Sequence, residues 1–212
     1  MTFAPILVFA LAGEPNPSAF GTKTTSDVRS QVSAPSDPHA GDGAYGRLDG
    51  DVDFGLGVGP SFDFASADAA LGVRATGHWF TIAGIYAMYL EALPDDARLQ
   101  RRLGVGVDLK PLFLLRWPRG LERGPALLDL TLDSISLGLG ITFGEQGERP
   151  FGSRRGFETS VGFGIPLALE AAGPWLEIRA GAVLPSSLES EASVLALFSW
   201  HFMTSTLSAS SR

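Results

Sequence analysis

Residues Leu103–Leu115 alternate between apolar positions and positions that are mostly small or charged. Every odd position is apolar, whereas the even positions include Gly104, Gly106, Asp108 and Lys110. Successive side chains of a β-strand point to opposite sides, so a period of two predicts a strand with one apolar face and one glycine-rich, charged face. Other stretches of the chain repeat this pattern.

From residue 45 onward we predict eight strands of this kind. They cover Leu48–Gly59, Asp68–Thr76, Trp79–Leu90, Leu103–Leu115, Ser134–Phe143, Phe157–Glu170, Leu176–Ala182 and Val194–Phe202. Most are long enough for a tilted strand to cross a bilayer, which takes roughly 9–11 residues. An even number of strands lets the sheet close with both ends of the chain on one side.

Several local features qualify this pattern. Gly77-His78 predicts a turn between the second and third strands, and the third strand is apolar on both faces. Leu128, Leu130 and Leu132 run in the opposite phase to the fifth strand, which predicts a β-bulge at Asp133-Ser134. Pro111 and Pro166 fall inside predicted strands, where a proline removes a ladder hydrogen-bond donor.

The charged residues of the glycine-rich face decide between a soluble and a membrane barrel. They are Asp51, Asp53, Arg74, Asp108, Lys110, Glu158 and Arg179. A dry soluble core would cost several kcal/mol for each unpaired ion, whereas a small transmembrane barrel is polar inside and apolar outside. We therefore predict an all-β, eight-stranded antiparallel up-and-down transmembrane β-barrel. The Gly-x-Gly pairs at 55/57, 104/106, 138/140 and 162/164 would leave interior room for arginine and lysine heads.

The composition of the chain argues against several classes of function and site. The formal net charge of −7 argues against nucleic-acid binding, which needs a basic surface. The longest apolar stretch, Trp79–Leu90, is too short for a spanning helix. The chain has no cysteine, which excludes disulfides and thiolate metal sites.

The ends of the chain differ from the barrel. Residues 1–12 are apolar and end in Ala10-Leu11-Ala12, which predicts the remnant of a signal peptide whose basic start lies upstream; the alternative is a short buried apolar segment. Residues 13–44 are rich in Ser, Thr, Pro and Gly and predict a flexible tether. The barrel would occupy residues 45–202, followed by a C-terminal tail at 203–212.

Connections and tryptophans predict the topology. The short connections Gly77-His78 and Ala171–Pro174 fit the periplasmic side, whereas Arg116–Ala126 is an exception to the short periplasmic turns of this barrel class. The four tryptophans, Trp79, Trp117, Trp175 and Trp200, would form an aromatic girdle at the periplasmic interface.

In these features the chain resembles the small eight-stranded outer-membrane barrels, the OmpA-like and OmpX-like family. The resemblance covers about Leu48–Phe202 and includes the closing Phe198-x-Trp200-x-Phe202, although the tail after it departs from the family. It implies a porin-like, non-enzymatic protein of the bacterial outer membrane with a filled polar interior and a structural or adhesion-type role. Its expected partners are outer-membrane lipids and extracellular molecules that contact loops 91–101 and 145–156. The expected state is a monomer.

Two alternatives stay open at this point. A soluble or periplasmic lipocalin-like barrel would bind an apolar ligand in its lumen, with the oily face inside. A lipid A-modifying hydrolase would need a serine, a histidine and a carboxylate, for which Ser199, His201 and Glu170 are candidates, although the order Ser-x-His reverses that of the barrel deacylases. His78 is interpreted as a turn residue and His39 as part of the tether. We expect no catalytic, cofactor or metal site.

Overall fold

The structure is a computed structural model that describes residues 45–93, 100–122, 124–145, 150–185 and 191–205. The strands are β1 (Val52–Asp63), β2 (Ala69–Trp79), β3 (Ala83–Ala92), β4 (Arg101–Leu109), β5 (Ser136–Glu145), β6 (Arg154–Pro166), β7 (Gly173–Pro185) and β8 (Glu191–Thr204). The helices α1 (Pro111–Arg116), η1 (Trp117–Arg119) and α2 (Ala126–Asp133) lie between β4 and β5. No helix among the described residues is long and apolar enough to cross a membrane. The predicted signal remnant and tether, and the tail from residue 206, lie outside the described residues.

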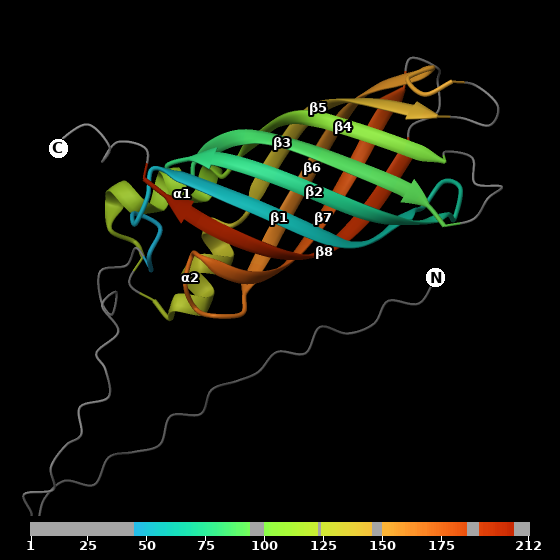
Figure 1. Ribbon diagram of the computed structural model, residues 1–212. Coiled ribbons are helices and arrows are strands. Elements are labelled where there is room, and N and C mark those ends of the chain that lie inside the picture. The colour runs from blue at the N-terminus through green and yellow to red at the C-terminus, as the bar shows by residue number, and fades with distance from the viewer. Residues whose placement is uncertain (1–44, 94–99, 123, 146–149, 186–190, 206–212) are drawn as a thin grey trace, which may run out of the picture. The chain divides into compact units, whose positions relative to one another are not determined.

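The eight strands form a closed barrel. Each strand pairs antiparallel with its neighbours in the chain, and β1 also pairs with β8. Closure leaves no unpaired sheet edge. Figure 1 shows that β1 begins and β8 ends at the end of the barrel that carries α1 and α2. We call this end of the barrel the helical end; Val52 of β1 pairs with Thr204 of β8 there. We call the opposite end of the barrel the hairpin end. The predicted eight-stranded up-and-down barrel is confirmed.

The predicted fourth strand is wrong beyond residue 109. β4 ends at Leu109, and Pro111 is the first residue of α1. Proline has no N–H and a φ fixed near the helical value, which suits the first turn of a helix. The predicted bulge at Asp133-Ser134 is also wrong, because the change of phase marks the end of α2 before β5 begins.

The turn predicted at Gly77-His78 is wrong as well. Both residues belong to β2, and the turn that leads to β3 lies at Phe80–Ile82. Its central residues, Phe80 and Thr81, have φ values of 48° and 59°. Two successive positive φ values define a type I′ hairpin turn, for which Asn-Gly is the usual sequence. The sequence does not signal this turn, because phenylalanine and threonine are not typical turn residues.

The remaining strand boundaries move by a few residues. β1 begins at Val52 rather than Leu48 and continues through Pro60. Pro166 is the last residue of β6, so the predicted continuation to Glu170 is wrong. A proline at the end of a strand removes no hydrogen bond from the interior of the ladder.

The predicted orientation of the two strand faces is confirmed. On β1, the outward Phe54, Leu56 and Val58 are 50%, 57% and 48% exposed. The charged residues of the opposite face are buried inside the barrel; they include Asp53, Arg74, Asp108, Lys110, Glu158 and Arg179. The molecule is thus charged inside and apolar outside.

Glycines on the inner face accommodate large side chains: the predicted room for an arginine head is present at Gly138 and Gly162, which lie against Arg179, and a tyrosine ring uses the same kind of space. Tyr86, Gly106 and Gly140 form one row across β3, β4 and β5. A Cβ at Gly140 would collide with the Tyr86 hydroxyl, and one at Gly106 would lie 2.8 Å from the same ring. The ring therefore lies over backbone that only glycine can provide.

An apolar layer inside the barrel was not predicted. Tyr86, Met88 and Leu90 of β3 pack with Leu195 and Leu197 of β8 in one buried cluster. The two apolar faces of β3 were visible in the sequence, but the partner strand was not. This layer lies toward the hairpin end, where the interior also holds the buried charged residues Arg102 and Glu191.

Candidate functional site in the barrel interior

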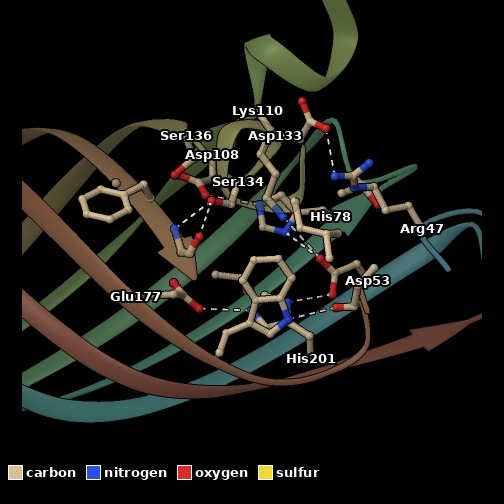
Figure 2. A pocket seen from close by; sticks show the side chains of 18 of the residues that line it. Arg47, Asp53, His78, Asp108, Lys110, Asp133, Ser134, Ser136, Glu177 and His201 are labelled. Atoms are coloured by element: carbon tan, nitrogen blue, oxygen red, sulfur yellow. Dashed lines mark hydrogen bonds and ion pairs between the residues drawn. The ribbon is translucent and has the colours of Figure 1, made fainter. Parts of the chain in front are cut away.

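A cluster of ionisable side chains fills the interior toward the helical end (Figure 2). Its members come from strands on all sides of the barrel: Asp53 from β1, His78 from β2, Asp108 from β4, Glu177 and Arg179 from β7, and His201 from β8, with Lys110 directly after β4. In each strand the inward positions of the two-residue period bring these side chains together.

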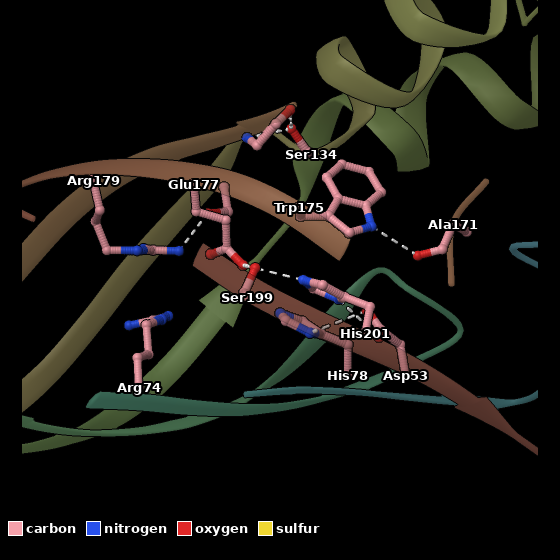
Figure 3. A network of polar contacts seen from close by, with 12 residues as sticks. Asp53, Arg74, His78, Ser134, Ala171, Trp175, Glu177, Arg179, Ser199 and His201 are labelled. Atoms are coloured by element: carbon pink, nitrogen blue, oxygen red, sulfur yellow. Dashed lines mark hydrogen bonds and ion pairs between the residues drawn. The ribbon is translucent and has the colours of Figure 1, made fainter. Parts of the chain in front are cut away.

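His201 joins two carboxylates. Its Nδ1 lies 3.0 Å from Asp53 Oδ1, and its Nε2 lies 3.0 Å from Glu177 Oε1 (Figure 3). Only a protonated imidazole can donate from both nitrogens, so the geometry fits a positively charged His201. Lys110 Nζ adds a donor 3.4 Å from Asp53 Oδ2. The Trp175 ring packs against the imidazole with the ring centroids 5.4 Å apart.

Asp108 organises the second half of the cluster. Arg179 donates from Nη1 to Oδ1 at 3.1 Å and from Nη2 to Oδ2 at 3.3 Å, the forked geometry of arginine with a carboxylate. Arg74 Nη2 lies 3.4 Å from Asp108 Oδ1, and its guanidinium stacks over the Tyr86 ring at 4.2 Å. Asp108 is therefore shared by two buried guanidinium groups, and its single negative charge can neutralise only one of them.

His78 connects the two halves. Its Nε2 lies 3.2 Å from Asp108 Oδ2, and its Nδ1 lies 3.8 Å from Asp53 Oδ2. The interpretation of His78 as a turn residue is wrong, because the side chain is buried in the interior. His39 lies outside the described residues.

The residues weighed for a hydrolase do not form a nucleophile and base pair. Ser199 Oγ donates to Glu177 Oε1 and not to His201. Both His201 nitrogens contact carboxylates, so neither is free to accept the serine proton. Glu170 is exposed in the connection after β6. The partner of the Ser199 hydroxyl is therefore Glu177 and not the histidine that the hydrolase alternative required.

Little space remains between these side chains. The cavity has about 40 Å³ open to the centres of water molecules, room for a few waters. No group of three or more His, Asp or Glu side chains in the described part of the chain is placed to hold a metal ion.

A second charged cluster closes the helical end around Arg47. Arg47 Nη1 lies 3.0 Å from Glu122 Oε1, and Nη2 lies 2.8 Å from Asp133 Oδ2. The guanidinium also lies 5.1 Å from the centre of the Phe113 ring. Burial, together with the neighbouring Asp133 carboxylate, raises the pKa of Glu122 to about 8, against the opposing effect of Arg47.

Arg116 completes this cluster from α1. Its Nη1 lies 2.8 Å from Asp133 Oδ1, and its Nη2 lies 2.5 Å from Asp129 Oδ1. Tyr45 donates to Asp129 Oδ2 at 3.1 Å. The segment before β1 and both α-helices are thus tied together by charge, which the sequence did not predict.

At the hairpin end, Glu191 bridges two arginines inside the barrel. Its Oε1 lies 2.5 Å from Arg154 Nη2, and its Oε2 lies 3.7 Å from Arg102 Nη1. On the outer surface of the same end, Arg101 lies 3.7 Å from both Glu91 and Glu145.

The predicted aromatic girdle is only partly present. Trp79, Trp117 and Trp200 are exposed at the helical end. The prediction for Trp175 is wrong, because its ring is buried in the lumen and its Nε1 donates to the Ala171 carbonyl at 3.0 Å.

Comparison of the chain with protein-family models, curated proteins and solved structures finds no match. The structure itself shows the closed antiparallel eight-stranded barrel. Among the interior residues, the two-residue period had placed Glu177, Arg179 and His201 on one face, but it could not identify their partners. Arg47 precedes all strands, and no pattern pointed to it.

Proposed function

We propose that the protein is a non-enzymatic outer-membrane β-barrel of the small OmpA-like and OmpX-like type, with a structural or adhesion-type role. It would be monomeric, embedded in outer-membrane lipid, and would present its hairpin-end loops to the cell exterior. The helical end would face the periplasm.

The observation that carries this proposal is the apolar belt on the outer surface. Among the described strand residues, outward charged side chains occur only at the hairpin end, where Glu91, Arg101, Glu145 and Arg155 lie. At the other end of the belt lie Trp79, Trp200 and Phe202, which are exposed. A soluble monomer rarely exposes a continuous apolar surface of this extent.

The height of the belt fits a bilayer. On β7 the outward positions from Pro174 to Leu184 are all apolar. At about 3.3 Å per residue and a tilt of about 40°, this stretch spans roughly 25 Å, the height of the apolar band in outer-membrane barrels.

The interior supports a structural role over transport or catalysis. Paired charges and the apolar layer fill the lumen, and Ser199 bonds to Glu177 and not to His201. A lipocalin-like function would need an open apolar lumen, whereas the buried side chains here include Asp53, Asp108 and Arg179. Recognition would then reside in loops 91–101 and 145–156, parts of which lie outside the described residues.

Membrane insertion can be tested by extraction and by gel mobility. The full chain, exported in a Gram-negative host, should sediment with outer membranes and require detergent for release. Closed barrels often resist detergent until boiled, so boiled and unboiled samples should migrate differently. Recovery in the soluble fraction with equal mobility of both samples would refute the proposal.

Loop exposure needs a separate test. No heavy atom lies within 4 Å of the position that a Cβ would take at Gly152, so an epitope inserted directly after this glycine, which keeps its φ of +83°, should leave the barrel intact. An antibody added to intact cells should bind it, whereas an epitope after Arg212 should react only after permeabilisation. The reverse labelling would overturn the orientation, and labelling of neither on intact cells would indicate a periplasmic location.

A further inference from the structure

Helix α2 differs from an ordinary surface helix because it buries its acidic side chains and exposes leucines. Its acidic residues Asp129 and Asp133 are each 1% exposed and face the Arg47 and Arg116 cluster. Two of its leucines, Leu127 and Leu128, are 46% and 52% exposed, while Leu130 is buried against Ala171 and Trp175. A surface helix of a soluble protein buries its apolar side and exposes its charged one.

The segment from α1 to residue 121 repeats this reversal. Leu114, Leu115, Trp117 and Leu121 are exposed, although they lie next to a buried charged cluster. We call α1, η1, residues 120–122 and α2 the helical cap. Among the described residues of the cap, Arg119 is the charged residue with an exposed side chain. Glu122 is buried. The outer face therefore combines leucines, a tryptophan and a cation, with its acids turned inward.

The cap also continues the apolar belt of the barrel. α1 begins two residues after the outward Leu109, and Figure 1 shows α1 and α2 at the end of the barrel where β2 and β8 end. The exposed Trp79 is the last residue of β2, and the exposed Trp200 lies near the end of β8. Leucine and tryptophan with basic residues are typical of helices that lie in the plane of a membrane interface and bind anionic lipids.

From this reversal, the charge of the face and its continuity with the belt, we propose that the helical cap lies in the periplasmic leaflet of the membrane. Its leucines and Trp117 contact the acyl-chain boundary, and Arg119 contacts lipid phosphates. This inference rests on the proposed membrane barrel. It adds that the long connection between β4 and β5 is a lipid-binding element and not a free periplasmic loop.

Tryptophan quenching tests the cap and the barrel separately. Two single-tryptophan versions of the full chain retain either Trp117 or Trp200, with phenylalanine at the other tryptophan positions. Both are refolded into phosphatidylcholine and phosphatidylglycerol vesicles that carry brominated acyl chains. We expect strong quenching of both and protection of Trp117 from iodide in water.

The outcomes are distinguishable. Quenching of Trp200 without quenching of Trp117 overturns the cap proposal and leaves the membrane barrel intact. Quenching of neither overturns both. Protection of Trp117 from iodide without quenching by lipid means that protein covers the cap, and sedimentation in detergent would then show whether a second copy does so; either result contradicts the lipid contact.

A second measurement avoids the tryptophan substitutions. Because the chain has no cysteine, Leu128→Cys can carry a single polarity-sensitive dye, with Ser153→Cys, at an exposed position of the hairpin end, as the matched control. The dye at position 128 should shift to the blue on vesicle binding and the dye at 153 should not. Arg119→Glu should weaken the shift in phosphatidylglycerol vesicles, and an unchanged spectrum at position 128 in the parent protein refutes the proposal.

Discussion

Replacement of Val161 by arginine tests whether the belt contacts lipid or water. Val161 points outward from β6 and is 49% exposed. It lies six residues from Arg155 at the rim, or roughly 15 Å along the barrel axis at about 3.3 Å per residue and a tilt of about 40°. This places it near the middle of a band roughly 25 Å high, where an arginine costs about 2–4 kcal/mol.

A surface facing water predicts a different result, because a surface substitution of this kind usually changes stability by less than about 0.5 kcal/mol. The assay is reversible urea unfolding in phospholipid vesicles, followed by tryptophan fluorescence. Leu184→Arg is the matched control, since Leu184 pairs with Phe157 near the charged rim and should cost at most about 1 kcal/mol. Equal stabilities of Val161→Arg and the parent protein would refute a lipid-facing belt.

The inward neighbour Ser160 is a poor control for this experiment. Its Oγ accepts a hydrogen bond from Arg179 Nη1 at 3.1 Å, and the side chain is buried. An arginine there would meet the Arg179 guanidinium in a filled space. We therefore expect Ser160→Arg to be damaging too, for reasons of packing and charge and not of lipid contact.

Three further predictions address packing, protonation and backbone strain. Gly140→Ala should cost about 1–3 kcal/mol, because its methyl would meet the Tyr86 hydroxyl, whereas the outward Gly77→Ala should be nearly neutral in the same urea assay. The raised pKa of Glu122, about 8, means that the parent protein loses stability as pH rises from about 4.5 to about 8. Glu122→Gln should remove this loss, and a parent urea midpoint that is constant between pH 5 and pH 9 would contradict it. Thr81→Gly should raise the free energy of unfolding by roughly 1 kcal/mol, since it relieves a positive φ at a non-glycine residue; lower stability would contradict the strain.

The barrel was predictable from the sequence because its two faces differ so strongly. Alternation identified eight strands and put Asp108 and Arg179 on the inner face, where both are buried. The alternation pattern failed in the connection between β4 and β5, where an apolar run of residues fits both a strand and a helix. The decisive signal is Pro111, which is an exception inside a strand but a typical first residue of a helix.

The candidate site was less predictable because partners across a barrel are set by register and tilt. The pairs His201 with Glu177 and Asp53 with His201 join neighbouring strands whose residues are 24 and 148 positions apart in the chain, and no local pattern encodes their register. Ser199 shows the limit most clearly. Its position two residues from His201 put both side chains on one face, yet Ser199 bonds to a neighbouring strand instead.

The interior is sealed differently at its two ends, and this determines how water could reach the charged cluster. Toward the hairpin end, Leu90, Leu195 and Leu197 form an apolar layer beside the ion pairs of Glu191, and removal of this layer would expose hydrocarbon to water. At the helical end, Arg47 closes the interior through Glu122 and Asp133, groups that water can solvate. Separating an ion pair into water costs far less than leaving its partners buried and unpaired. Any opening of the interior should therefore begin with movement of the helical cap, and the apolar layer should keep the barrel closed to ions even when the cap moves.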